Sequence, residues 1–227
     1  MTTLDRTTVS DRSLNVDLVG PDRETINAPR ITIRERPRRT AKPDLMRMAA
    51  AVRELLIGLG EDPDREGLLD TPMRVARSFA EQNAGLRDDP AKHLGRVFNS
   101  PYDGVVQVRG IDFYGLCEHH LLPIIGKVHI AYLPRDGKVV GISKLARLVD
   151  VYAHRPQVQE RMTAEIVQAL ERHLDPRGIV VRVEAEHLCM KVRGVKRPCA
   201  STLTVLRRGV FASEPQHWPE LVELLKA

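Results

Sequence analysis

Apolar residues recur at helical spacing in the first part of the chain. Over residues 44–59 they fall on one face, and Asp44 can cap the first turn. A second helix is predicted to begin at Thr71, which acts as its cap and is followed by a proline in the first turn. A short helix over 90–97 completes a helical region that we expect to span residues 44–100.

After residue 100 the apolar pattern changes to the period-two alternation typical of β-strands. Strands are predicted at residues 105–108 (leading towards Cys117), 124–133, 179–187 and 202–211. Helices are predicted at residues 143–153, 156–174 and, near the end of the chain, 218–225. The order strand-strand-helix-helix-strand-strand indicates an antiparallel sheet with two helices on one face. We therefore expect an α+β fold over a domain that spans residues 101–227.

The positive charge of the chain is concentrated near its start. The net charge is +5, and residues 1–43 hold eight Arg and one Lys against four Asp and two Glu. This polar, irregular segment predicts a disordered basic extension, with a nucleic-acid-binding arm as the alternative. Neither a secretory signal nor an apolar run long enough for a membrane span is present in the sequence, so we expect a cytoplasmic protein.

The candidate chemistry lies in Cys117-Glu118-His119-His120 and in the later His187-Leu188-Cys189. Thiolate sulfur and imidazole nitrogen are the ligands that zinc prefers, and three protein ligands with an open position are typical of a catalytic zinc site. The period-two pattern over residues 179–189 predicts that His187 and Cys189 project from the same face of a strand. The alternative is a buried cysteine among ordinary histidines.

The number of cysteines agrees with a metal site in a reducing compartment. The chain has three, Cys117, Cys189 and Cys199, and an odd number does not suggest a disulfide framework. Cys199 follows a proline in an expected turn and receives no role.

Two further clusters could bind a ligand. Ser143, Lys144 and Arg147 lie at the start of a predicted helix, where free N–H groups and cationic side chains suit phosphates; the alternative is a charged solvent face. Gln159 and Glu160 fall off the apolar stripe of the next helix. They could hydrogen-bond the donor edge of a guanine or pterin ring, or form an exposed polar surface.

The chain resembles the GTP cyclohydrolase I family over about residues 44–211. The resemblance is carried by GEDPDREGL (60–68), TPMRVA (71–76), FYGLCEHHLLP (113–123), GISKLAR (141–147), RPQVQER (155–161), EHLCM (186–190) and RGV (193–195). It implies the tunnelling fold, in which an antiparallel sheet with two helices assembles into a barrel. It also implies a homodecamer with active sites at subunit interfaces and no nucleic-acid or membrane partner.

The same resemblance implies a role for each candidate residue. The zinc ligands are Cys117, His120 and Cys189, and the catalytic residues are His119 and His187. The residues that bind GTP are Glu118, Ser143, Lys144, Arg147, Gln159, Glu160 and Arg193. The implied reaction opens the imidazole ring of GTP, releases formate and forms 7,8-dihydroneopterin triphosphate, the first step of pterin, folate or deazapurine synthesis. A structural zinc module on the same fold is the alternative.

A few positions depart from the family pattern. Gly115 stands near a usual serine, and Cys199 stands where glycine is frequent. Leu203 and Val205 are apolar in a strand that is usually rich in hydroxyl side chains.

Overall fold

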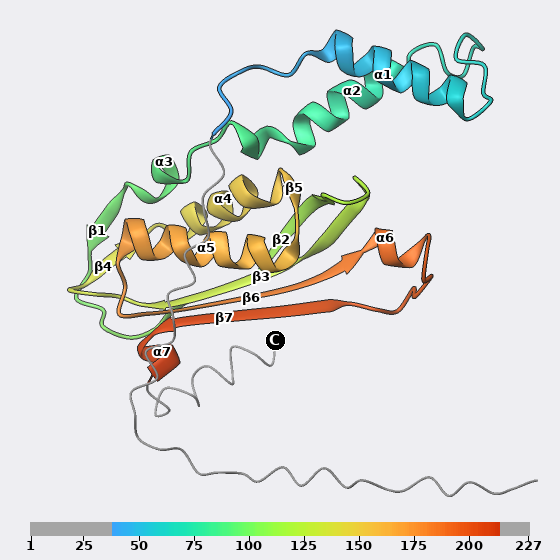
Figure 1. Cartoon of the computed structure of the whole chain (residues 1–227). Helices are drawn as coiled ribbons and strands as arrows, with labels where there is room; N and C mark the ends of the chain where they lie inside the picture. The colour runs from blue at the N-terminus through green and yellow to red at the C-terminus, as the bar shows by residue number, and fades with distance from the viewer. Residues whose placement is uncertain (1–37, 214–227) are drawn as a thin grey trace, which may run out of the picture.

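A five-stranded sheet forms the centre of the computed structural model, which describes residues 38–213 (Figure 1). The strand order is β5-β2-β3-β6-β7. The strands are β2 (Val106–Cys117), β3 (Pro123–Leu133), β5 (Pro156–Gln157), β6 (Gly178–His187) and β7 (Thr202–Gly209). The helix predicted at 218–225 and most of the predicted extension at 1–43 lie outside the described residues.

Two helices cover one face of this sheet, as the sequence predicts (Figure 1). They are α4 (Ile142–Ala153) and α5 (Gln159–Leu174), and their apolar sides pack on β2, β3 and β6. Val128 and Ile130 of the sheet and Leu148 and Ile166 of the helices are fully buried in this layer. The predicted α+β fold, an antiparallel sheet with two helices on one face, is therefore confirmed.

The remaining elements lie around this two-layer body. Helices α1 (Leu45–Gly58) and α2 (Thr71–Gln82) pack on each other and extend away from the sheet (Figure 1). The smaller elements are η1 (Ala84–Leu86), α3 (Pro90–Leu94), β1 (Val97–Asn99), β4 (Lys138–Val140), α6 (Leu188–Lys191) and α7 (Val210–Ser213). Among the described residues, no helix is both long and apolar enough to cross a bilayer.

The helix starts differ in part from the prediction. Asp44 caps α1 as expected, since its side chain accepts a hydrogen bond from the backbone N–H of Arg47. Asp70, rather than Thr71, precedes the first residue of α2. Ser143 does not cap α4, which begins one residue earlier, after Gly141.

The helix predicted at 156–174 begins three residues later than expected. Pro156 and Gln157 instead form β5, which pairs in parallel with Leu116 and Cys117 at the end of β2. The side chain of Gln157 is buried and donates to the backbone oxygen of Tyr152. This pairing ties the end of α4 and the start of α5 to Cys117.

The second face of the sheet carries alternating residues that the helices do not cover. Arg182 and Glu184 of β6 pair with Val205 and Leu203 of β7, which places these four residues on one face. Leu203 and Val205, the apolar departures from the family pattern, are exposed there. They therefore lie on the opposite face of β7 from Thr202 and Thr204, which meet α5.

Candidate active site

The first half of the candidate site is the turn between β2 and β3. Cys117 ends β2 and is buried, and its backbone N–H donates to the backbone oxygen of Leu122. The backbone N–H of Leu121 donates to the backbone oxygen of Cys117, and Leu121 adopts a positive φ of 54°. This closed turn holds His119 and His120 at its tip, beside the Cys117 thiol.

The second half comes from the end of β6, where one prediction is wrong. Strand β6 ends at His187, and Cys189 lies in the single helical turn α6. The two side chains therefore do not share a strand face, because the helical turn replaces the period-two alternation. The turn nevertheless brings Cys189 to Cys117 and His120, and the three candidate ligand atoms lie within 4.8 Å of one another.

This cluster fits a zinc ion. Zn–S bonds of about 2.3 Å and Zn–N bonds of about 2.0–2.1 Å place the ligand atoms of a tetrahedral site about 3.5–3.8 Å apart. Cys117 Sγ lies 4.0 Å from His120 Nδ1, so small side-chain adjustments would close the site. His119 Nδ1 is similarly near Cys117 Sγ, at 3.9 Å, but His119 is not part of the three-residue cluster.

The ionisation of the thiols also suits a metal ligand set. Burial raises the pKa of the Cys189 thiol, and the neighbouring Cys117 raises it further. The Cys189 thiol therefore resists ionisation until a cation compensates the charge, and metal binding would release its proton. Arg193 donates from Nη1 to His120 Nε2 at 2.8 Å, which brings this predicted substrate ligand to the edge of the cluster.

His187 has a partner that the sequence did not predict. Its Nε2–H donates to Gln159 Oε1 at 2.8 Å. The amide of Gln159 is oriented by donation from Nε2 to the backbone oxygens of Val183 and Thr202, each at 3.0 Å. Gln159 is buried, so the alternative that it forms an exposed polar surface is wrong. Its side chain contacts His187, and its role in binding a purine stays a prediction.

The hydrogen bond to Gln159 fixes the tautomer of His187. Because an amide oxygen only accepts, the proton must be on Nε2 of the neutral ring. Nδ1 has no hydrogen-bond partner among residues 38–213, so it is the nitrogen that can meet a ligand. Burial lowers the pKa of His187, and the Glu160 carboxylate opposes this shift.

Glu118, His119 and Glu160 complete the surroundings of the cluster. Glu118 forms an ion pair with Arg161 of α5, a contact that the sequence did not predict. His119 is largely exposed, and its Nε2 lies 4.0 Å from Glu118 Oε1. Glu160 is exposed at the start of α5. The three side chains are thus accessible to a substrate.

Ser143, Lys144 and Arg147 are not brought to this cluster within one chain. They occupy the first two turns of α4, whereas the last residue of α4 leads into β5 beside Cys117. At a rise of about 1.5 Å per residue, Ser143 is separated from the end of α4 by about 15 Å along the axis. Ser143 and Arg147 are exposed and Lys144 is partly exposed, so their side chains remain accessible.

The family model and the curated relatives that match this chain agree on one family. The family model described as GTP cyclohydrolase I matches residues 48–226. GTP cyclohydrolase 1 of Rhodopirellula baltica is 47% identical over 216 residues, which cover 95% of this chain and 93% of that protein. GTP cyclohydrolase 1 of Mycolicibacterium gilvum is 54% identical over 183 residues, 80% of this chain and 91% of that one. Among solved structures, the apo archaeosine synthase QueF-Like aligns with 49% of this chain and 97% of its own at TM-score 0.40 and 19% identity.

Proposed function

The chain belongs to the GTP cyclohydrolase I family, and on that premise we propose that it hydrolyses GTP. The reaction opens the imidazole ring of the purine, releases formate and forms 7,8-dihydroneopterin triphosphate. The observation that supports this most is the clustering of Cys117, His120 and Cys189, with accessible histidines beside them. Three ligands with room for a fourth are what a hydrolytic zinc site needs.

In this proposal Cys117, His120 and Cys189 hold a zinc ion. Zinc would supply Lewis-acid chemistry, acidifying water so that it becomes a nucleophile near neutral pH. The two thiols and the imidazole come from separate elements, β2 with its turn and α6. The folded chain thus determines the donor geometry, and Arg193 beside His120 provides a positive charge next to it.

His187 exchanges a proton with the purine ring in this proposal. Gln159 retains the Nε2 proton of His187, which leaves Nδ1 to exchange a proton with N7 of the guanine ring. Protonation of N7 makes C8 electrophilic, so that water can add there and the ring can open. The lowered pKa of His187 makes its protonated ring a stronger acid, although a smaller fraction is protonated at neutral pH.

His119 and Glu160 serve the remaining steps. His119 is exposed beside the turn, where it can carry a proton during the second hydrolysis, which releases formate. Glu160 accepts hydrogen bonds from the donor edge of guanine, and Glu118, held by Arg161, borders the same space. The later rearrangement of the ribose and closure of the pterin ring are inferred from the family alone.

We propose that a second copy of the chain completes the site. Ser143, Lys144 and Arg147 suit a triphosphate but lie at the far end of α4 from Cys117. In a homodecamer with interfacial sites, these residues would come from a neighbouring subunit and meet the substrate held by Arg193 and Glu160. The assembly would thus join the phosphate-binding and hydrolytic parts of one active site.

The proposal is tested by incubating the purified chain with GTP and, in parallel, with ATP. We expect a pterin chromophore and formate from GTP alone, because Glu160 suits the donor edge of guanine and would repel the adenine acceptors. Metal bound at one equivalent per chain without product from either nucleotide would favour the structural zinc module instead.

A further inference from the structure

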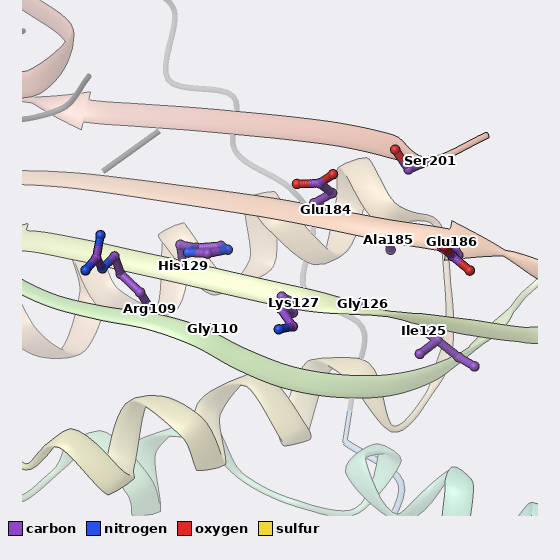
Figure 2. A pocket seen from close by; sticks show the side chains of 10 residues that line it. All are labelled: Arg109, Gly110, Ile125, Gly126, Lys127, His129, Glu184, Ala185, Glu186 and Ser201. Carbon is purple, nitrogen blue, oxygen red and sulfur yellow. The ribbon is translucent and has the colours of Figure 1, made fainter. Parts of the chain in front are cut away.

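The helix-free face of the sheet carries a cavity that the proposed reaction does not use. Its volume is about 730 Å³, and its side chains come from β2, β3 and β6 and from the segment before β7 (Figure 2). The residues that matter for its chemistry are Arg109, Ile125, Lys127, His129, Glu184 and Glu186. This face points away from α4 and α5, which cover the other side of the same strands.

A β-bulge places Arg109 over this cavity. Val108 pairs with Ile130 and Ile111 pairs with Val128, so Arg109 and Gly110 together stand opposite His129. Gly110 adopts a φ of 68°, a conformation that glycine reaches without strain. Bulges of this kind redirect side chains and are common beside functional sites. Figure 2 shows the Arg109 and His129 side chains on the same face of the sheet.

His129 is a buried polar group with an unused nitrogen. Only 5% of the residue is exposed, and Nδ1 has no hydrogen-bond partner among the described residues. Burial lowers the pKa of His129, and the charges of Arg182, Arg109 and Lys127 lower it further while Glu184 opposes them. The ring therefore lies in a positive potential that a bound anion would relieve.

Two of the cations at the cavity, Arg109 and Lys127, lack a carboxylate partner in the part of the chain that the structure describes. Glu184 is paired with Arg182 at 2.8 Å, and Glu186 is paired with Lys191 at 2.7 Å. Within residues 38–213, no carboxylate lies within 4.0 Å of the cationic groups of Arg109 or Lys127, although Asp112 and Glu184 neighbour Lys127 in register. Two exposed cations thus remain available to one ligand, beside a buried imidazole whose Nδ1 has no partner among the described residues.

We propose that this cavity binds a small phosphate-bearing anion, held by Arg109, Lys127 and His129. Arg109 can offer two N–H groups to phosphate oxygens, Lys127 adds a point charge, and His129 donates from Nδ1. Ile125, at the other end of the cavity, could contact an attached sugar or base. The proposal is independent of the GTP reaction, which uses the opposite face of the sheet and the turn after β2.

Calorimetric titration with pyrophosphate tests the proposal. The full-length background carries Lys144→Ala and Arg147→Ala, which removes the candidate phosphate site at α4. Arg109→Gln and Lys127→Gln should each weaken the remaining binding about tenfold or more, because each removes a charge-assisted contact. Both residues are exposed, so the substitutions should leave the fold intact, and Lys138→Gln on β4 is the matched control.

Adenosine monophosphate titrated in parallel separates the two sources of phosphate. Tighter binding than pyrophosphate would assign the cavity to nucleotides, and weaker binding would assign it to inorganic phosphates; both support a phosphate site. The proposal is overturned if neither ligand binds in this background. It is equally overturned if the Arg109 and Lys127 variants bind like the parent, or if Lys138→Gln weakens binding as much as they do.

Discussion

Gln159→Leu separates the positioning of His187 from metal binding. Leucine has nearly the volume of glutamine but cannot hydrogen-bond. The substitution removes the 2.8 Å contact to His187 Nε2 and the two 3.0 Å bonds to the backbone oxygens of Val183 and Thr202. Because Gln159 is only 3% exposed, we expect the free energy of unfolding to fall by about 1–3 kcal/mol.

The expected effect on catalysis is larger than the effect on stability. Without Gln159, His187 loses the acceptor that fixes its ring and tautomer, and kcat for formate release should fall about 10–100-fold. This fall in kcat should not exceed that of His187→Ala, which removes a general acid that contributes about 10²–10⁴-fold to the rate. Metal content should stay at the parent value in both variants, since the side-chain hydrogen bonds of Gln159 in the described structure go to Val183, Thr202, Thr204 and His187 and not to a ligand residue.

The matched control is Thr163→Val. Thr163 Oγ1 bonds the backbone oxygen of Gln159 at 2.8 Å and Thr204 Oγ1 at 2.7 Å, so valine disturbs the same buried network without touching His187. The assay is steady-state formate release together with metal analysis and urea unfolding. If Gln159→Leu kept the kcat of Thr163→Val, or if it lost metal, the positioning role of Gln159 would be refuted.

Three further predictions follow from other parts of the chain. Cys189→Ala should lose bound zinc and turnover, whereas the exposed Cys199→Ala should keep both; metal analysis decides. Lys144→Ala and Arg147→Ala should each raise KM for GTP, because each loses a contact worth about 1–3 kcal/mol of binding free energy. If two chains share a site, mixed oligomers of either variant with Cys189→Ala should regain activity. Burial lowers the pKa of His129, so the unfolded state binds more protons near its ordinary value of about 6.5. The free energy of unfolding should therefore fall as pH drops through this window, and His129→Gln should reduce that fall in urea titrations.

The sequence predicted the metal cluster for a partly wrong reason. The C-x-x-H spacing correctly indicated that Cys117 and His120 are near each other, because residues three positions apart in a short turn must lie close together. The strand pattern up to residue 187 was also correct, but it could not show that a helical turn begins at Leu188. Cys189 reaches the cluster through that turn, whose position depends on tertiary contacts.

Gln159 shows why the local periodicity was insufficient. It lies off the apolar stripe of α5, so an exposed position was a reasonable expectation. It is buried because β7 passes beside α5 and supplies Thr202 and Thr204 as partners. A signal was available in Gln159 and Thr163, which stand four residues apart and face the alternating threonines of β7. Predicting that these α5 side chains meet the threonines of β7 required the position of β7 in the fold, which the pattern of a single strand does not reveal.

The fate of carbon C8 of GTP shows whether this chain opens the imidazole ring of the purine. GTP labelled with ¹³C at C8 is incubated with the zinc-loaded chain, and the products are followed by ¹³C NMR. We expect the label to appear in formate, with one formate per pterin formed, and we expect Cys117→Ala to abolish both products. Label that remains in a purine or in the pterin, or formate release that survives in the Cys117 variant, would contradict metal-dependent opening of the imidazole ring at this site.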